Sequence, residues 1–248
     1  MTTTYSQTEA VEQAVDHPLD PLTGDEIEAA VDVLESEWTD ADDPVYHIVV
    51  LEEPSKETVA AFEPGDTMER EAFIVLRQNE ETYEATVSIT GDELLSVDHI
   101  EDVQPALTPD EVELAEEITK NDDDWREAAA KRGVENFDLV IVDPWPASGF
   151  EPPEYEDRRL VRSISWIATE ENDNAYARPI EGLFAFVDLD EEAVVKIEDT
   201  GVVDEDNPLP PEDADYRADR VDTRDDFEHL DVVQPDGPSF DVDGQHVE

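Results

Sequence analysis

Hydrophobic residues recur at helical spacing in some segments and form short strand-like runs in others. The order of these segments divides the chain into two similar units. In the first unit, Thr23 and Glu26 have the spacing of a helix capping box, and apolar residues then recur at helical spacing to about Trp38. One short helix fits between residues 54 and 62. The strand-like runs are residues 45–51, 72–76, 82–89 and 94–99. Residues 17–104 are therefore predicted to form a first small domain of helix and strands.

The second unit repeats this plan. Thr108 and Glu111 have the same capping-box spacing, with Pro109 at the first helical position. A second helix is predicted over residues 124–131. The strand-like runs are residues 137–142, 160–168, 182–189 and 194–198. Because helices and antiparallel strands are segregated, residues 105–200 are predicted as a second α+β domain like the first.

The apolar run at residues 137–142 shows no alternation. Such a pattern is typical of a strand covered on both faces or placed at the centre of a sheet. The run leads into a loop rich in proline, glycine and aromatic residues. Trp145 lies on a rigid proline corner in that loop, where it could line a site or simply cover the edge of a core.

A second loop, residues 172–182, also stands out because it ends in a well-defined strand. Its Tyr176 and Arg178 could face a partner, and Arg178 could equally pair with one of the many local acids. Residues 1–16 are polar and predicted to be disordered. Residues 201–226 are rich in proline and acids, which predicts an extended acidic connector, and the residues after them regain apolar and turn character.

The charge balance is extreme. Asp and Glu number 70 against 15 Lys and Arg, for a formal net charge of -55, although 38% of the residues are hydrophobic. Self-repulsion of such a surface opposes folding at low salt, whereas at about 1 M the Debye length falls to roughly 3 Å. The composition therefore indicates an acid-coated globular protein from a salt-loving source with a salty cytoplasm.

The composition also excludes several classes of function. Nucleic acid and anionic membranes are excluded as partners because there is no basic surface to bind them. The absence of cysteine excludes disulfides and thiolate metal sites. The N-terminal stretch lacks the charged and apolar regions of a signal peptide, and no run is long enough to span a bilayer, so a cytoplasmic protein is expected.

A search for chemistry-bearing motifs finds no catalytic set and no metal site. The five histidines are scattered, without HxH or HExxH spacing. Close carboxylates are uninformative among 70 acids, and the acidic runs at 122–124 and 204–206 lack the spacing of a calcium loop. No phosphate-binding glycine loop and no GxSxG motif occurs.

A series of short motifs nevertheless occurs in a distinctive order. They are HPLDPL at 17–22, the hairpin at 83–97, VQP at 103–105, KRG at 131–133, VDPW at 142–145, ARPIEGL at 177–183, EDTGV at 198–202, and QPDGPSF at 234–240 with VDG at 242–244. In this order the chain resembles the two small α+β domains, N2 and N3, that precede the catalytic domain of copper-containing, topaquinone-dependent amine oxidases. The resemblance implies cystatin-like folds, with residues 201–248 as the linker and the start of a catalytic domain that is missing from this chain.

The family resemblance also implies a function. Such enzymes oxidise primary amines to aldehydes and release ammonia and hydrogen peroxide, using copper held by three histidines and a quinone formed from tyrosine in Asn-Tyr-Asp/Glu. No tyrosine of this chain follows asparagine, so neither cofactor is expected here.

The resemblance therefore implies an accessory portion that supplies scaffold and the mouth of the substrate channel, the latter at Pro144, Trp145 and Tyr176. The partners it implies are the catalytic domain, in the same or a separate chain, a second subunit of a homodimer, and a primary amine. The alternative is a stand-alone protein-binding module of two α+β domains, which an unpaired sheet edge or apolar patch would favour.

Overall fold

The computed structural model describes most of the chain from residue 17 onward. Left out are residues 1–16, 41, 64, 148, 150–151, 156–157, 212, 218, 223, 229–232, 234, 236, 238–241, 244–245 and 248. The N-terminal stretch predicted to be disordered therefore lies outside the described residues.

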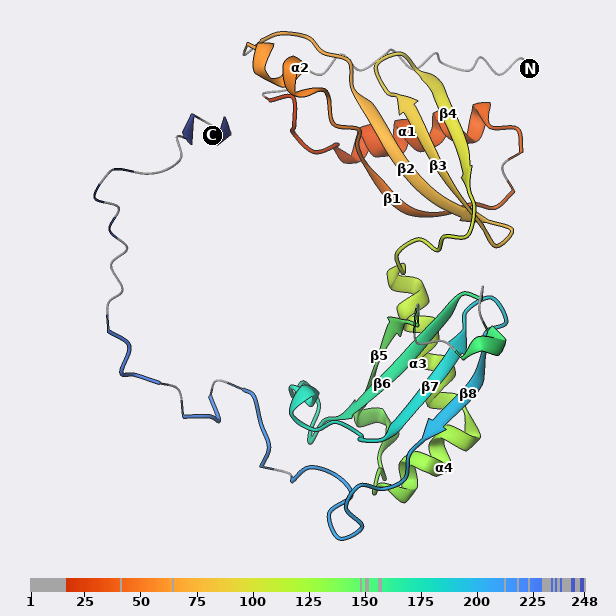
Figure 1. The fold of residues 1–248 in the computed structure, drawn as a ribbon, viewed down its shortest axis with the longest axis vertical. Coiled ribbons are helices and arrows are strands. Elements are labelled where there is room, and N and C mark those ends of the chain that lie inside the picture. Colours follow the sequence, from red (N-terminus) through yellow and green to blue (C-terminus); the bar gives the residue numbers. More distant parts are fainter. Residues whose placement is uncertain are drawn as a thin grey trace, which may run out of the picture.

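The first unit is a four-stranded antiparallel sheet with one helix across a face (Figure 1). Its elements are α1 (Gly24–Glu37), β1 (Val45–Leu51), α2 (Lys56–Ala61), β2 (Glu71–Gln78), β3 (Glu81–Ser88) and β4 (Glu93–Ile100). The strands follow in sequence order, β1-β2-β3-β4. Leu34 of α1 packs with Ile74, Leu76 and Val87 of the sheet, and all four are fully buried.

The second unit has the same plan with two helices on one face of its sheet (Figure 1). Its elements are α3 (Pro109–Asn121), α4 (Asp123–Lys131), η1 (Phe137–Leu139), β5 (Val140–Pro146), η2 (Pro153–Tyr155), β6 (Leu160–Ile167), η3 (Ala175–Ala177), β7 (Leu183–Asp188) and β8 (Ala193–Asp199). The sheet order is β5-β6-β7-β8. Trp125, Leu183 and Val187 are fully buried in its core. Two short strands, β9 (Val242–Asp243) and β10 (His246–Val247), pair near the end of the chain.

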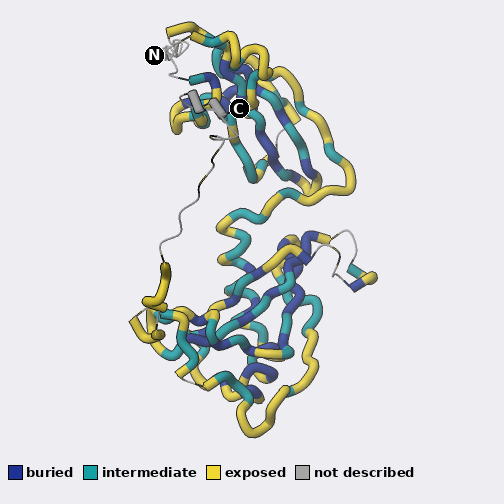
Figure 2. The backbone as a smooth tube through the Cα atoms, turned by 60° about the vertical axis from the view of Figure 1, so that its left-hand side comes forward, coloured by how far each residue is buried: buried dark blue, intermediate teal, exposed yellow. Residues whose placement is uncertain are grey.

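This arrangement confirms the predicted α+β class, with two helix-plus-antiparallel-sheet units in succession. Figure 2 shows buried positions along the helices and strands of both units, and mainly exposed positions along the segment that follows the second sheet.

The prediction of a central, doubly covered strand at residues 137–142 is wrong. Residues 137–139 form η1, where the Phe137 ring packs edge-on against Trp125 at 6.2 Å between centroids. The strand β5 that follows is an edge strand, and Ile141 is 39% exposed on its open side. The run lacks alternation because it joins a helical turn, whose apolar residues contact the core, to a strand covered on one face only.

The segment after β8 contacts the second unit as far as Arg220. Leu209 packs against the core, and Arg178 Nε donates a hydrogen bond to the carbonyl of Pro210. Arg217 and Arg220 both form ion pairs with Glu170. The prolines and acids predicted as an extended connector are thus tied to the second unit at several points before the chain leaves it.

An arginine clamp closes each unit in the same way. In the first unit, Arg70 lies directly before β2 and donates from Nε to Oε1 of Glu26 at 2.9 Å. Its Nη1 and Nη2 donate to the carbonyls of Asp20 and Pro21, just ahead of the capping Thr23. The capping box, the entry to the helix and the second strand are therefore held by one buried side chain.

The second unit repeats this clamp residue for residue. Arg159 lies directly before β6, and its Nη2 donates to Oε2 of Glu111 at 2.8 Å. The same guanidinium donates to the carbonyls of Pro105 and Ala106, at the same offsets from Thr108 as in the first unit. The sequences LTGDE at 22–26 and LTPDE at 107–111 underlie the match. The two units therefore share a specific device as well as an architecture.

Replacing Thr108 by alanine tests the capping box. The Thr108 hydroxyl accepts a hydrogen bond from the backbone of Glu111, whose carboxylate in turn accepts from the backbone of Thr108. We expect Thr108→Ala to lower the free energy of unfolding by about 1 kcal/mol. Urea denaturation followed by circular dichroism measures the change. Thr108→Ser, which keeps the hydroxyl, should have little effect, and an equal loss in both variants would contradict the cap.

The two units also contact each other. Arg77, at the end of β2, donates from Nη1 and Nη2 to both carboxylate oxygens of Asp190 in the β7–β8 turn, at 2.8 Å each. Nearby, His47 Nδ1 lies 2.7 Å from the carbonyl of Ala106 in the linker. Burial lowers the pKa of His47, so this ring is neutral near pH 7 and the contact is a hydrogen bond donated to the carbonyl.

Breaking the pair between Arg77 and Asp190 should loosen the two units. Because the pair is bidentate and partly buried, a double-mutant cycle of Arg77→Gln and Asp190→Asn should give a coupling free energy of about 1–2 kcal/mol. Small-angle scattering should show a larger radius of gyration for each variant. Lys131→Gln breaks an exposed pair within α4 and serves as the control, with no change in dimensions expected. Unchanged scattering in Arg77→Gln would contradict the role of the pair.

Candidate functional site

The open face of the second sheet carries the strongest candidate site. Side chains alternate along β5, so that Val140 and Val142 face the helices while Ile141, Asp143 and Trp145 face away from them. Trp145 is 58% exposed. A large aromatic residue this exposed on a regular strand indicates a surface for contact rather than core packing.

Two further aromatic rings join this face. Trp166 on β6 pairs across the strands with Ile141, and its ring meets that of Tyr176 edge-on at 4.8 Å between centroids. Tyr176 is positioned by η3, which begins where the Asn174 side chain accepts a hydrogen bond from the Tyr176 backbone. The following Pro179 bridges back to Trp166, so the loop runs along the end of β6.

The carboxylate of Asp143 completes the group. Tyr176 Oη donates a hydrogen bond to Asp143 Oδ2 at 3.2 Å. Partial burial and the negative charge of Asp143 together raise the pKa of Tyr176, so the phenol keeps its proton. We refer to Asp143, Trp145, Trp166 and Tyr176 as the aromatic cluster.

The nearest cross-strand cation turns away from the aromatic cluster. Arg162 on β6 lies opposite Trp145, yet its guanidinium stacks over the Phe184 ring of β7 at 3.7 Å from the centroid. Its Nη2 lies 3.8 Å from Glu198 on β8. The side chain therefore leans toward β7 and β8, on the side away from β5.

The residues predicted at the channel mouth take different positions. Trp145 and Tyr176, 53% exposed, both belong to the aromatic cluster. Pro144 is buried and, by strand alternation, faces the helix side. Arg178 is also buried. Its Nε donates a hydrogen bond to the Pro210 carbonyl, and it forms no ion pair with an acid among the described residues. Sequence reasoning missed Trp166, although alternation along residues 160–167 would have placed it on the open face.

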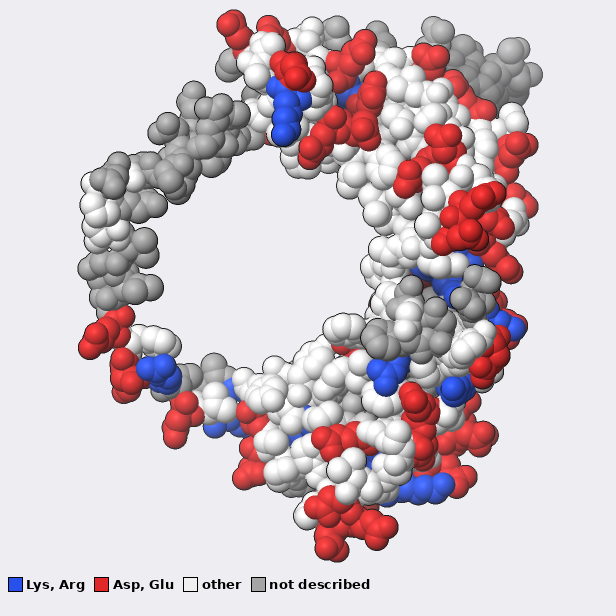
Figure 3. Space-filling model, viewed as in Figure 1, with Lys and Arg blue, Asp and Glu red and all other residues white. Residues whose placement is uncertain are grey.

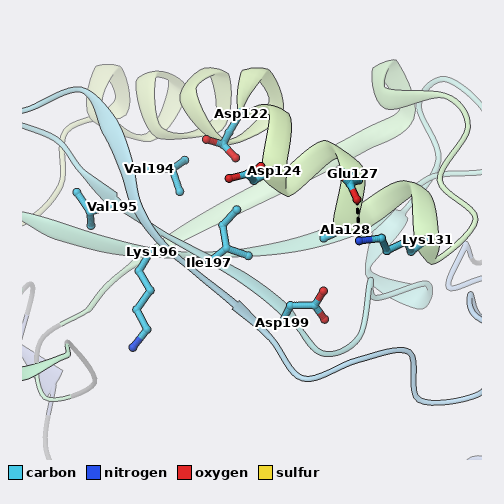
Figure 4. Close-up of a pocket in the computed structure, with 10 residues that line it drawn as sticks. All are labelled: Asp122, Asp124, Glu127, Ala128, Lys131, Val194, Val195, Lys196, Ile197 and Asp199. Carbon is cyan, nitrogen blue, oxygen red and sulfur yellow. Dashed lines mark ion pairs between the residues drawn. The ribbon is translucent and has the colours of Figure 1, made fainter.

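A shallow hollow of about 350 Å³ lies between α4 and β8 in the second unit (Figure 4). Its charged side chains are of both signs, and Lys131 pairs with Glu127 on the helix itself. Figure 4 shows Lys196 directed away from the acids of α4. The hollow thus lacks the convergent polar groups of a ligand site.

A larger cavity of about 730 Å³ lies between the two units. It is lined by the β2–β3 turn, the linker and the start of β6, and its cations are Arg158 and Arg159. Both arginines are already paired within the second unit, Arg158 with Asp188 and Arg159 with Glu111. The cavity is therefore a consequence of how the units join. Neither arginine offers it an unpaired positive charge.

The described residues do not fit a copper site. Within them, no group of three or more His, Cys, Asp or Glu side chains is arranged to hold a metal ion. His99 pairs with Glu81 at 2.6 Å, and His47 contacts a backbone carbonyl. In the part of the chain that the structure covers, no helix is both long and apolar enough to cross a membrane.

Comparison with known families identifies both units. Residues 17–100 match the family model "Copper amine oxidase, N2 domain", and residues 110–219 match "Copper amine oxidase, N3 domain". The chain therefore belongs to the copper amine oxidase family and carries its N2 and N3 domains.

Individual relatives agree with this assignment. The chain is 36% identical over 237 residues to the primary amine oxidase of Arthrobacter sp. (strain P1), and 30% identical over 279 residues to the copper-containing diamine oxidase 1, peroxisomal, of Nicotiana tabacum. Each match covers 94% of this chain and 35% of the relative, so the chain spans about a third of their length.

A solved structure supports the fold. The chain is similar to the copper-containing benzylamine oxidase from Hansenula polymorpha, with a TM-score of 0.68 and 19% identity. The match covers 94% of this chain and 39% of that chain.

Proposed function

We propose that this chain is the N-terminal accessory portion of a copper- and quinone-dependent primary-amine oxidase. It supplies scaffold and, through Trp145 and Tyr176, part of the mouth of the substrate channel. The proposal is carried by one observation: the N2 and N3 units occur in family order, and the second presents an exposed aromatic group on its uncovered sheet face. Such a face fits a surface that meets the catalytic portion or its substrate.

The proposal includes partners and a setting. The chemistry belongs to a catalytic domain, in the same chain or a separate one, that binds copper and forms the quinone, and the full enzyme is proposed to be a homodimer. The substrate is a primary amine, which is oxidised to the aldehyde with release of ammonia and hydrogen peroxide. The net charge of -55 supports a salt-rich cytoplasm as the setting.

The experiment compares the 248-residue chain with the native protein isolated from its source. Peroxide released from benzylamine is measured with a coupled peroxidase, and copper is measured by mass spectrometry. We expect no peroxide from the chain alone, and copper-dependent peroxide release from the native protein. Peroxide from the chain alone, or a native protein without copper or oxidase activity, would overturn the proposal and favour a protein-binding module.

The channel-mouth part of the proposal has its own test. In the native protein, Trp145→Ala should change kcat/KM for an arylalkylamine at least about threefold, because a stacking surface is lost. Val50→Ala removes another exposed apolar residue, on β1 of the first unit, and kcat/KM should stay unchanged. Equal effects of the two substitutions would argue against a role for the second sheet in substrate passage.

A further inference from the structure

Among the described residues, the carboxylate of Asp143 has no cationic partner. All 15 lysines and arginines lie among the described residues, and none comes within 4.0 Å of it in an ion pair. Its one side-chain hydrogen bond there is the bond from Tyr176 Oη to Oδ2. In the described part of the chain, Oδ1 accepts no hydrogen bond from another protein group.

The rings of the aromatic cluster also differ from five other aromatic rings of the chain. Five aromatic residues carry a cation of the chain itself over their rings: Phe137, Tyr155, Phe184, Phe186 and Phe227. Trp145, Trp166 and Tyr176 do not, as far as the described residues go. Among the described residues, these three rings therefore carry no cation of the chain itself, and two of them, Trp145 and Tyr176, are exposed.

The geometry suits one small cation. Asp143 and Trp145 are two residues apart on the same face of β5, which places their Cα atoms roughly 7 Å from each other. Tyr176 contacts both Asp143 and Trp166. Trp166 lies opposite Ile141, so by strand register the two tryptophans lie on opposite sides of Asp143 along β5. An ammonium group held by Asp143 would therefore lie near aromatic faces, which attract cations electrostatically.

We infer that the aromatic cluster binds the ammonium group of a primary amine, with Asp143 as the counter-ion and the rings of Trp145, Trp166 and Tyr176 around it. The inference rests on the proposed function in taking the ligand to be the amine on its way to the catalytic portion. The site is open and shallow, so its role is to raise the local concentration of amine at the channel mouth. We expect a dissociation constant on the order of 1–10 mM.

The chain offers four tryptophans as internal probes. Two of them, Trp145 and Trp166, belong to the aromatic cluster, whereas Trp38 and Trp125 lie elsewhere, Trp125 fully buried. Benzylammonium chloride is titrated into the 15N-labelled chain at constant ionic strength, and the four indole N–H resonances are followed. The Trp145→Leu spectrum assigns the Trp145 resonance. We expect the resonances of Trp145 and Trp166 to shift and saturate, while those of Trp38 and Trp125 stay in place.

Two comparisons separate ammonium recognition from weaker explanations. Benzyl alcohol, a neutral molecule of the same shape, should cause less than a fifth of the shift at equal concentration. Asp143→Asn keeps an acceptor for Tyr176 and should weaken binding at least fivefold. Asp138→Asn removes an exposed acid of the same unit from outside the aromatic cluster, and binding should remain within twofold. Circular dichroism confirms that each variant is folded.

Each result decides the inference. Equal shifts with benzyl alcohol would reduce the site to apolar stacking. Equal shifts of all four tryptophans, or equal losses in both Asp variants, would mean general attraction to an acidic surface, and either result would overturn the inference. Failure of this inference can be distinguished from failure of the proposed function, because the titration needs only this chain whereas peroxide release needs the native protein.

Discussion

Replacing Arg159 by leucine should lower the free energy of unfolding of the second unit by about 3–5 kcal/mol, the largest effect we expect from a single substitution. Arg159 is 3% exposed at its side chain, and its loss leaves the Glu111 carboxylate without its cation. It also removes the donors to the Pro105 and Ala106 carbonyls, which lie just ahead of α3. Urea unfolding followed by the near-ultraviolet signal of Trp125, in the core of this unit, measures the change.

Glu111 makes this effect depend on pH. Hydrogen bonds and charge from Arg159 lower the pKa of Glu111 even though partial burial opposes them. A lowered pKa in the folded state adds stability that is present above the unfolded pKa and is lost as pH falls through the folded one. The difference in stability between the native chain and Glu111→Gln should therefore shrink as pH falls below about 4.5. A difference that stays constant with pH would contradict a charged pair.

The exposed pair of Lys131 and Glu127 is the control for the Arg159 experiment. Both of its side chains are more than half exposed, and Lys131→Gln should leave the unfolding midpoint unchanged. The corresponding Arg70→Leu should destabilise the first unit through the loss of its pair with Glu26. If Arg70→Leu and Arg159→Leu both left their units stable, the clamps would be incidental contacts.

Raising potassium chloride from about 0.1 M to about 2 M should raise the thermal unfolding midpoint by about 15 °C or more, because the acids repel one another less as the Debye length falls. Acidic side chains are spread over the visible surface of both units and outnumber the basic ones there (Figure 3). Circular dichroism at increasing salt measures the midpoint. A midpoint that does not change with salt would refute the interpretation of the charge as an adaptation to salt.

A variant with fewer acids should need less salt. The substitutions Glu52→Gln, Glu53→Gln, Asp98→Asn and Glu117→Gln remove exposed carboxylates that form no ion pair among the described residues. Their combination should shift the salt dependence to lower concentration while leaving the plateau at high salt unchanged. Sodium chloride at equal ionic strength should act like potassium chloride, since screening depends on charge and concentration.

The helices could be predicted because their signals are local. Thr23 with Glu26, and Thr108 with Glu111, set the first residues of α1 and α3 through contacts within one turn. The antiparallel strands could also be predicted, although short turns join only β2 to β3, β3 to β4 and β7 to β8. The position of β5 in its sheet could not, because an apolar run alone does not distinguish a covered strand from a helical turn joined to an edge strand.

Only some residues of the candidate site could be predicted from the sequence. Trp145 and Tyr176 stood out as aromatic residues in loops with unusual composition. Asp143 and Trp166, the two side chains that contact Tyr176, are brought to it by strand register and by η3. Likewise the pairing of Arg159 with Glu111 joins residues far apart in the sequence. Local patterns carry no information on such pairs, since only the folded sheet brings them together.

The clamps also set an order for folding during synthesis. Each unit begins with its helix, but the arginine that pairs with the helix is synthesised later. Arg70 follows Glu26 by 44 residues, and Arg159 follows Glu111 by 48 residues. The first helix can therefore dock while the ribosome is still making the second unit. The pair of Arg77 and Asp190 spans 113 residues and closes only after both units have emerged. Nascent chains stalled at a length that lets the first unit emerge through Ile100 should thus already hold a docked first helix.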